Sequence, residues 1–145
     1  MQISTKFTIA VHILAATKFF GEDQKITSTF LAGSIGSNPV IVRNIMQQLQ
    51  EAGIIFVKRG PGGITITRPL SEITFLDIYK AVETNSEEDL FRFHEKPNPQ
   101  CPVGKNIHKA LDQSLADIQK EFEKELASHN LQEVYDKIEA AQITA

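Results

Sequence analysis

The sequence of 145 residues predicts a mainly helical fold with a small β-hairpin, an α+β class. Three observations support this prediction. Apolar residues recur at helical spacing in several segments, which is typical of helices with one buried face. Two short segments rich in β-branched residues flank a glycine-rich turn, which indicates a hairpin. A long apolar stripe near the C-terminus predicts one extended helix.

Composition limits the class of protein. An apolar share of 41% is enough for a folded core and argues against a largely disordered chain. The single cysteine excludes a disulfide framework, and also a zinc or iron–sulfur site built only from this subunit's cysteines. No segment reaches the roughly 18–20 uninterrupted apolar residues of a membrane span. We therefore expect a cytoplasmic protein that does not enter a membrane.

The net charge of −3 is unevenly distributed along the chain. Residues 1–69 contain seven Lys or Arg and three Asp or Glu, a net charge of +4. Residues 70–145 contain eight Lys or Arg and fifteen Asp or Glu, a net charge of −7. Such asymmetry favours a basic binding face in the first half. An ordinary solvated surface is the alternative.

The N-terminal segment is predicted to form a packed helix, because Phe7, Ala10 and Leu14 lie at helical spacing. An export signal is the alternative, since Lys6 precedes an apolar stretch. However, His12 interrupts that stretch. The pattern therefore favours the packed helix.

Two further helices are predicted around a tight turn. Thr27 or Ser28 can cap a short helix that ends near Ile35. After the turn, Asn38 and Pro39 suit the N-cap and first position of the second helix. That helix is expected to end near Ala52, since Gly53 suits the position after a helix C-terminus. Its inward residues should be Ile41 or Val42, with Ile45, Met46 and Leu49, and its outward residues Val40, Arg43, Asn44 and Gln47.

The predicted hairpin follows this helix directly. Residues 54–58 and 64–67 should form its two strands, with Arg-Gly-Pro-Gly-Gly at 59–63 as the tip. Thr74 and Asp77 then match a capping box, which predicts the start of another helix.

The C-terminal part begins with a connector. Residues 84–102 combine an acidic run with three prolines, so we expect a loop there. A long helix over about 103–128 and a shorter one over about 131–141 follow. The long helix carries an apolar stripe at Ile107, Leu111, Leu115, Ile118, Phe122 and Leu126. Nothing obvious in the same subunit would cover all of it, which predicts a homodimer that buries Ile107, Leu111, Leu115, Ile118 and Phe122.

The order of a short helix, a tight turn, a second helix and a hairpin predicts a winged helix-turn-helix protein that binds double-stranded DNA. We divide the chain into a DNA-binding domain (1–83), a connector (84–102) and the dimerisation and C-terminal helices (103–145). Candidate base contacts are Asn38, Val40, Arg43, Asn44 and Gln47. Candidate phosphate contacts are Lys6, Ser28, Lys58 and the Gly60 backbone, and Arg59 suits the minor groove. A solvated surface role is the alternative for each of them.

The sequence also resembles the Rrf2 family of winged-helix transcription regulators over nearly its whole length. The resemblance is carried by residues 3–6, 10–11, 38–43, 49, 52–53, 59–63, 73–77 and 81–83. Residues 98–104, Asn-Pro-Gln-Cys-Pro-Val-Gly, resemble the connector of the single-cysteine members. The resemblance implies a homodimer that binds an imperfect palindrome and usually represses transcription. Several relatives hold an iron–sulfur cluster with three connector cysteines, but this chain has only Cys101, so no cofactor is expected.

Other functions are less well supported by the sequence. The spacing of His94, Cys101 and His108 matches no compact metal site, and no pattern indicates a catalytic nucleophile or an enzyme. Cys101 is a candidate redox sensor, with a small packing residue as the alternative. A winged-helix module for protein–protein contact without DNA binding is the alternative function. The sequence identifies no small-molecule effector.

Overall fold

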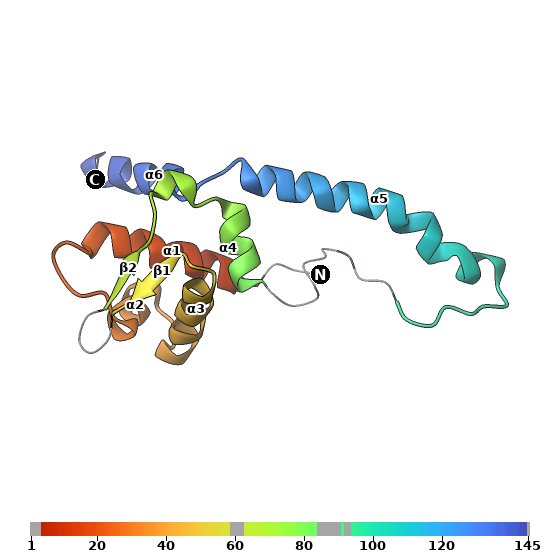
Figure 1. Ribbon diagram of the computed structural model, residues 1–145, viewed down its shortest axis with the longest axis horizontal. Coiled ribbons are helices and arrows are strands. Elements are labelled where there is room, and N and C mark those ends of the chain that lie inside the picture. The colour runs from red at the N-terminus through yellow and green to blue at the C-terminus, as the bar shows by residue number, and fades with distance from the viewer. Residues whose placement is uncertain (1–3, 59–62, 84–90, 92–93, 145) are drawn as a thin grey trace.

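The computed structural model describes residues 4–58, 63–83, 91 and 94–144. Its elements are α1 (Thr5–Phe20), α2 (Ser28–Ile35), α3 (Pro39–Glu51), β1 (Ile55–Val57), β2 (Ile64–Ile66), the short 3₁₀ helix η1 (Leu70–Glu72), α4 (Phe75–Val82), α5 (Pro102–Ala127) and α6 (Leu131–Thr144). The predicted fold, mainly helical with a two-stranded hairpin, is confirmed. Figure 1 shows a packed body from which α5 extends alone.

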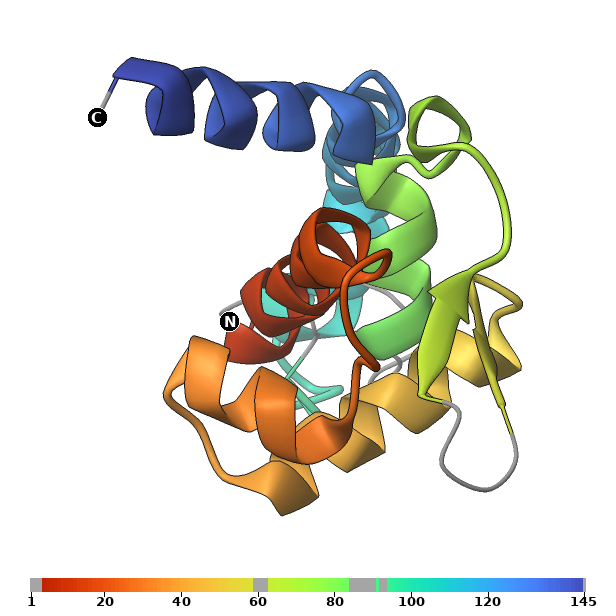
Figure 2. The same cartoon turned by 90° about the vertical axis from the view of Figure 1, so that its left-hand side faces the viewer.

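The core of the body forms around α1. Ala10, Ile13 and Leu14 are completely buried, as the apolar spacing of the segment predicts. Helix α1 contacts α2, α3, α4 and α6, and Figure 2 shows it in the middle of the body, between α2 and α3 on one side and α6 on the other. Burial of its apolar face stabilises this arrangement.

The predicted ends of α2 and α3 are confirmed. Thr27, rather than Ser28, is the N-cap of α2, and its side chain accepts a hydrogen bond from the Phe30 N–H at 3.1 Å. Asn38 caps α3 in the same way, with Pro39 in the first turn. Gly53 follows α3 with φ 79°, a left-handed conformation that glycine adopts without a steric penalty. These signals place α2 and α3 on either side of a tight turn.

The hairpin pairs Ile55 with Ile66 and Val57 with Ile64 in an antiparallel register. Each strand is shorter than the sequence predicts, three residues instead of five and four. A β-carbon at Gly63 would lie 2.9 Å from the Ile26 backbone. The Ile64 N–H also donates to the Ile26 carbonyl at 3.1 Å. The start of β2, next to the tip of the hairpin, is therefore held against the segment that precedes α2.

The start of α4 joins the body to the junction between α5 and α6. The capping box is confirmed: Thr74 and Asp77 exchange hydrogen bonds between side chain and backbone. The Phe75 N–H donates to the His129 carbonyl at 2.9 Å, and the Leu131 N–H donates to the Ile73 carbonyl at 2.9 Å. Leu131 is fully buried in the common core, so α6 packs against the body. Helix α6 continues to residue 144, three residues beyond the predicted end.

Helix α5 differs from the other long helices. It has no buried residue, although its bounds match the predicted helix within one residue at each end. Near its C-terminal end, the Phe122 ring packs edge-on against Tyr79 of α4, with 5.4 Å between ring centroids. Ile118 remains 48% exposed and Leu111 36%. None of the helices in the described part of the chain has the length and hydrophobicity needed to cross a membrane.

Candidate nucleic-acid interface

The outer face of α3 is polar at its centre. Arg43, Asn44 and Gln47 are exposed there, as the sequence predicts. The sequence offers Ile41 and Val42 as alternative inward residues. In the structure Val42 is buried in the core, and Ile41 is 45% exposed. Arg43 and Asn44 make no side-chain hydrogen bond or ion pair with any described residue, so both can bind a ligand.

Two of the candidate base contacts already have partners within α3. The Asn38 side-chain oxygen accepts from the Val40 N–H at 2.7 Å, which leaves the NH₂ group of that amide available. The Gln47 amide nitrogen donates to the Glu51 carboxylate at 3.3 Å. This contact directs the donor of Gln47 toward the C-terminus of α3 and leaves its oxygen as an acceptor.

A groove of about 340 Å³ runs beside the exposed face of α3. It is lined by Lys6, Ile41, Asn44, Ile45, Gln47, Gln48 and Glu51. Lys6 lies in the first turn of α1, so the fold brings this cation next to α3. The groove therefore combines a cation, a carboxylate, three amides and two apolar side chains on one surface.

The other candidate contacts come from α2 and the hairpin. Ser28 is the first residue of α2 and is half-buried, whereas Lys58 is exposed at the end of β1. Arg59 and Gly60 lie outside the described residues. In Figures 1 and 2, α2, α3 and the ends of the strands that lead to the tip lie along the same side of the body.

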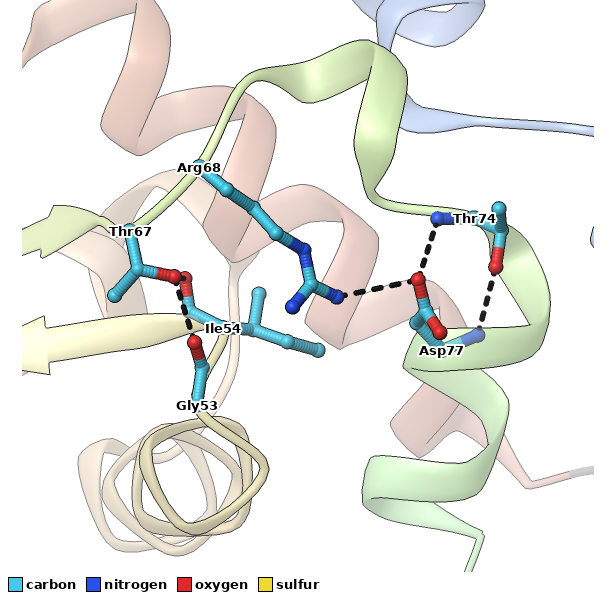
Figure 3. Close-up of polar contacts among 6 residues, drawn as sticks. All are labelled: Gly53, Ile54, Thr67, Arg68, Thr74 and Asp77. Atoms are coloured by element: carbon cyan, nitrogen blue, oxygen red, sulfur yellow. Dashed lines mark hydrogen bonds and ion pairs between the residues drawn. The ribbon is translucent and has the colours of Figure 1, made fainter.

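Two side chains that the sequence analysis did not identify connect the hairpin to its neighbours (Figure 3). The Thr67 hydroxyl donates to the Gly53 carbonyl at 2.6 Å and lies 3.0 Å from the Ile54 carbonyl. The Arg68 guanidinium forms an ion pair with Asp77 at 3.2 Å. Thr67 thus links the hairpin to the end of α3, and Arg68 links it to α4.

The connector packs closely against the first turn of α5. A β-carbon at Gly104 would lie 2.7 Å from the Asn98 carbonyl oxygen. Cys101 is the N-cap residue of α5 and is half-buried. The nearby backbone N–H groups of Gly104, and then of Val103, stabilise the thiolate and lower the pKa of Cys101.

Two histidines of this region, His94 and His108, contact each other. The His108 Nε2 lies 3.0 Å from the His94 carbonyl oxygen, and the two rings pack edge-on at 5.5 Å. Within the described ranges, no three His, Cys, Asp or Glu side chains come together as metal ligands.

Comparison with known proteins identifies the family. The family model Rrf2, described as an iron-dependent transcriptional regulator, matches residues 3–137. The chain belongs to the Rrf2 family. This Rrf2 protein is 37% identical over 136 residues to YwnA of Bacillus subtilis, described as a "Putative HTH-type transcriptional regulator". The match covers 94% of this chain and 98% of YwnA.

Solved structures have the same fold. A crystal structure described as that of "a putative DNA binding protein" is 34% identical, with a TM-score of 0.70. The match covers 89% of this chain and 97% of that one. CymR, the global cysteine regulator of B. subtilis, is 17% identical with a TM-score of 0.68, and the match covers 94% of this chain and 98% of CymR. The predicted Rrf2 winged-helix fold is confirmed.

The description of the family model names iron, and this chain offers few residues that could bind it. The chain contains one cysteine. His94 and His108 contact each other through a backbone carbonyl, and the described residues provide no group of three ligands. The single cysteine does not fit an iron–sulfur cluster held by this subunit's cysteines, and the residues that the structure describes do not fit an iron ion.

Proposed function

We propose that this Rrf2-family regulator is a homodimer that binds a palindromic operator in double-stranded DNA and represses transcription. The main observation in support of this proposal is the exposed polar face of α3. Arg43 and Asn44 are exposed and without a partner among the described residues. Helix α3 itself lies on the side of the body where the hairpin also lies. This arrangement suits a recognition helix in the major groove with a wing beside it.

Base recognition is assigned to the side chains of α3. Arg43 can donate two hydrogen bonds to guanine, and Asn44 can pair with adenine. The free oxygen of Gln47 can accept a hydrogen bond from the amino group of adenine. The free NH₂ group of Asn38 can donate to a base edge at the start of the helix. Val40, 51% exposed, can pack against a thymine methyl group.

Backbone recognition is assigned to groups around α3. Lys6, Ser28, Lys58 and the Gly60 backbone N–H are proposed to contact phosphates, and Arg59 to enter the minor groove. The net charge of +4 over residues 1–69 supports this assignment, because phosphate contacts provide much of the affinity of DNA-binding proteins. A regulator of promoter DNA acts where that DNA is, so we place the protein in the cytoplasm.

Dimerisation is assigned to α5. The proposed interface consists of Ile107, Leu111, Leu115, Ile118 and Phe122. Its support is that α5 buries no residue in its own subunit and leaves Ile118 48% exposed. A twofold partner would remove this apolar surface from water. The dimer would then present two α3 helices to two half-sites of one operator.

Cys101 is proposed to make the regulator responsive to oxidants. Its lowered pKa increases the thiolate fraction, and the thiolate is the reactive form. The thiolate attacks one oxygen of hydrogen peroxide, so that an S–O bond forms, the O–O bond breaks and hydroxide leaves. The resulting sulfenic acid would disturb the close contact between the connector and α5. We expect peroxide to release wild-type protein from DNA and to spare Cys101→Ser.

The proposed function is tested by a gel shift with the DNA upstream of the protein's own gene. Binding should weaken as salt concentration rises, because phosphate contacts release counterions. Arg43→Ala should reduce the preference for this DNA over unrelated DNA, whereas Lys109→Ala on α5 should not. Transcription from the same promoter should fall when the protein is added. Absence of binding to any DNA would instead favour a winged-helix module for protein–protein contact.

A further inference from the structure

Ile41 is an exposed apolar residue in an otherwise polar setting. It is 45% exposed on α3, next to Val40 at 51%. Single exposed apolar residues are common on proteins, but two adjacent ones at the start of an amphipathic helix form a small apolar patch. The core does not need this patch, because Val42 and Ile45 already provide the inward face of that turn.

The position of Ile41 makes it suitable for contact with DNA bases. It is the third residue of α3, and the N-terminal residues of a recognition helix are the ones that reach base edges. It lines the groove beside α3 together with Lys6, Asn44 and Gln47. Asn44 lies three residues further along, about 4.5 Å up the helix axis, which is somewhat more than the roughly 3.4 Å between neighbouring base pairs.

The chemistry of the major groove restricts what Ile41 can contact favourably. Base edges there present hydrogen-bond donors and acceptors, and the C5-methyl group of thymine is their apolar feature. Against a polar edge, Ile41 would displace water without replacing its hydrogen bonds, which costs free energy. Against a thymine methyl group, both apolar surfaces leave water together.

We propose that Ile41 is a specificity-determining residue that packs against the C5-methyl group of a thymine in each operator half-site. This inference rests on the proposed DNA-binding function and adds a base preference to it. The thymine lies next to the base pair that Asn44 contacts, and the methyl group contributes affinity independently of hydrogen bonds.

Deoxyuridine provides the test, because it differs from thymidine by that methyl group alone. Wild-type protein first selects an operator from a random pool of DNA duplexes. Each thymine of the selected operator is then replaced by deoxyuridine, one at a time. At the position that Ile41 contacts in each half-site, wild-type affinity should fall about fourfold, the effect of exposing one methyl-sized group. Ile41→Ala should bind the thymine operator and the operator with deoxyuridine at that position equally well.

Control variants separate this contact from general effects. Ile138→Ala removes a residue of similar exposure, 41%, on α6, and should keep the full preference for thymine. Ile41→Ala should melt at about the same temperature as wild type, because alanine has a high helix propensity and Ile41 is exposed. Val40→Ala shows whether the neighbouring side chain reads the same methyl group.

Three outcomes would overturn the inference. Wild-type protein could bind every deoxyuridine operator as well as the thymine operator, so that no methyl group is read. Ile41→Ala could retain the fourfold preference, or Val40→Ala alone could abolish it, so that another residue reads the methyl group. If the random pool yields no enriched sequence, the proposed sequence-specific DNA binding itself fails. The exposed patch of Val40 and Ile41 would then be assigned to a protein interface.

Discussion

Helices α1 and α5 both carry an apolar stripe at helical spacing, but the two stripes differ in how far the same chain buries them. In α1, Ile13 and Leu14 are completely buried by other parts of the same chain. Helix α5 buries no residue, and Ile118 on its stripe is 48% exposed. An apolar stripe therefore predicts a helix, but tertiary contacts decide what covers it. The body buries its own apolar stripe, whereas α5 leaves part of its stripe exposed in this chain.

The largest expected effect comes from a charge on the α5 stripe. Ile118→Glu should give monomers or insoluble protein, because a carboxylate would be buried in the proposed dimer interface. The two half-sites would no longer be bound together, so operator affinity should fall by a factor on the order of 10² to 10⁴. Sedimentation and a gel shift measure the two effects.

A matched control for Ile118→Glu is Gln113→Glu, which adds the same charge on the opposite face of α5. This variant should remain dimeric and bind DNA almost as well as wild type. Wild-type protein that sediments as a monomer at micromolar concentration would contradict the dimer proposal.

The body should be sensitive to a loss of packing. Leu49→Ala removes a completely buried side chain of α3 and should lower the free energy of unfolding by about 2–5 kcal/mol. Denaturant titration measures this change. Leu111→Ala makes the same substitution on α5 and should instead alter how assembly depends on concentration. Equal losses of folding stability would indicate that α5 belongs to the same core.

The exposed arginine of α3 should affect binding without affecting folding. Arg43→Ala should weaken operator binding by about 1–3 kcal/mol and relax the preference at one base pair. Arg59→Ala should weaken binding by a similar amount through the wing. Stability should change by no more than about 0.5 kcal/mol in either variant, as is usual for surface residues. Affinities across a set of single-base operator variants test this prediction, and a uniform loss for Arg43→Ala would assign it to a phosphate instead.

The capping box of α4 should have a smaller effect. Thr74→Ala removes the acceptor for the Asp77 N–H and should lower the free energy of unfolding by about 1 kcal/mol. Thr74→Ser keeps a hydroxyl oxygen at this position and should recover most of the loss. The same denaturant titration measures both variants. Equal stability of the two would show that the Thr74 cap does not stabilise the fold.

The smallest expected effect concerns the Cys101 thiol. Stabilisation of the thiolate by the N–H groups of Gly104 and Val103 lowers its pKa. Alkylation of the native protein should therefore reach half its maximal rate at a lower pH than alkylation of the unfolded chain. If the two pH midpoints coincide, the first turn of α5 does not activate this cysteine.

Local signals in the sequence predict the ends of α2 and α3 and the start of α4, whereas the 3₁₀ helix η1 gave no such signal and α6 runs three residues past its predicted end. Asn38 and Pro39 indicated the start of α3, and Gly53 indicated its end, because these residues satisfy backbone groups or adopt a special φ angle. Thr74 and Asp77 predicted the start of α4 for the same reason. Each of these signals acts within a few residues of the chain, where the sequence alone is informative.

Other features depend on contacts between distant segments. The spacing of α3 left Ile41 and Val42 as alternatives, because neighbouring helix positions differ by only about 100° and packing against the body decides between them. Thr67 and Arg68 gave no signal, since their partners lie nine to fourteen positions away. The DNA contacts and the dimer interface stay predictions, because they depend on a second molecule.

The anchored junction between α5 and α6 has a mechanical consequence. Backbone hydrogen bonds at Phe75 and Leu131 hold this end of α5 against α4. The helix has 26 residues, so its other end, where Cys101 lies, is about 39 Å away. With such a lever arm, a rotation of about 5° at the junction moves the far end by about 3 Å, close to one base-pair step. In the proposed dimer, a small angular change in α5 would therefore be enough to put the two recognition helices out of register with an operator.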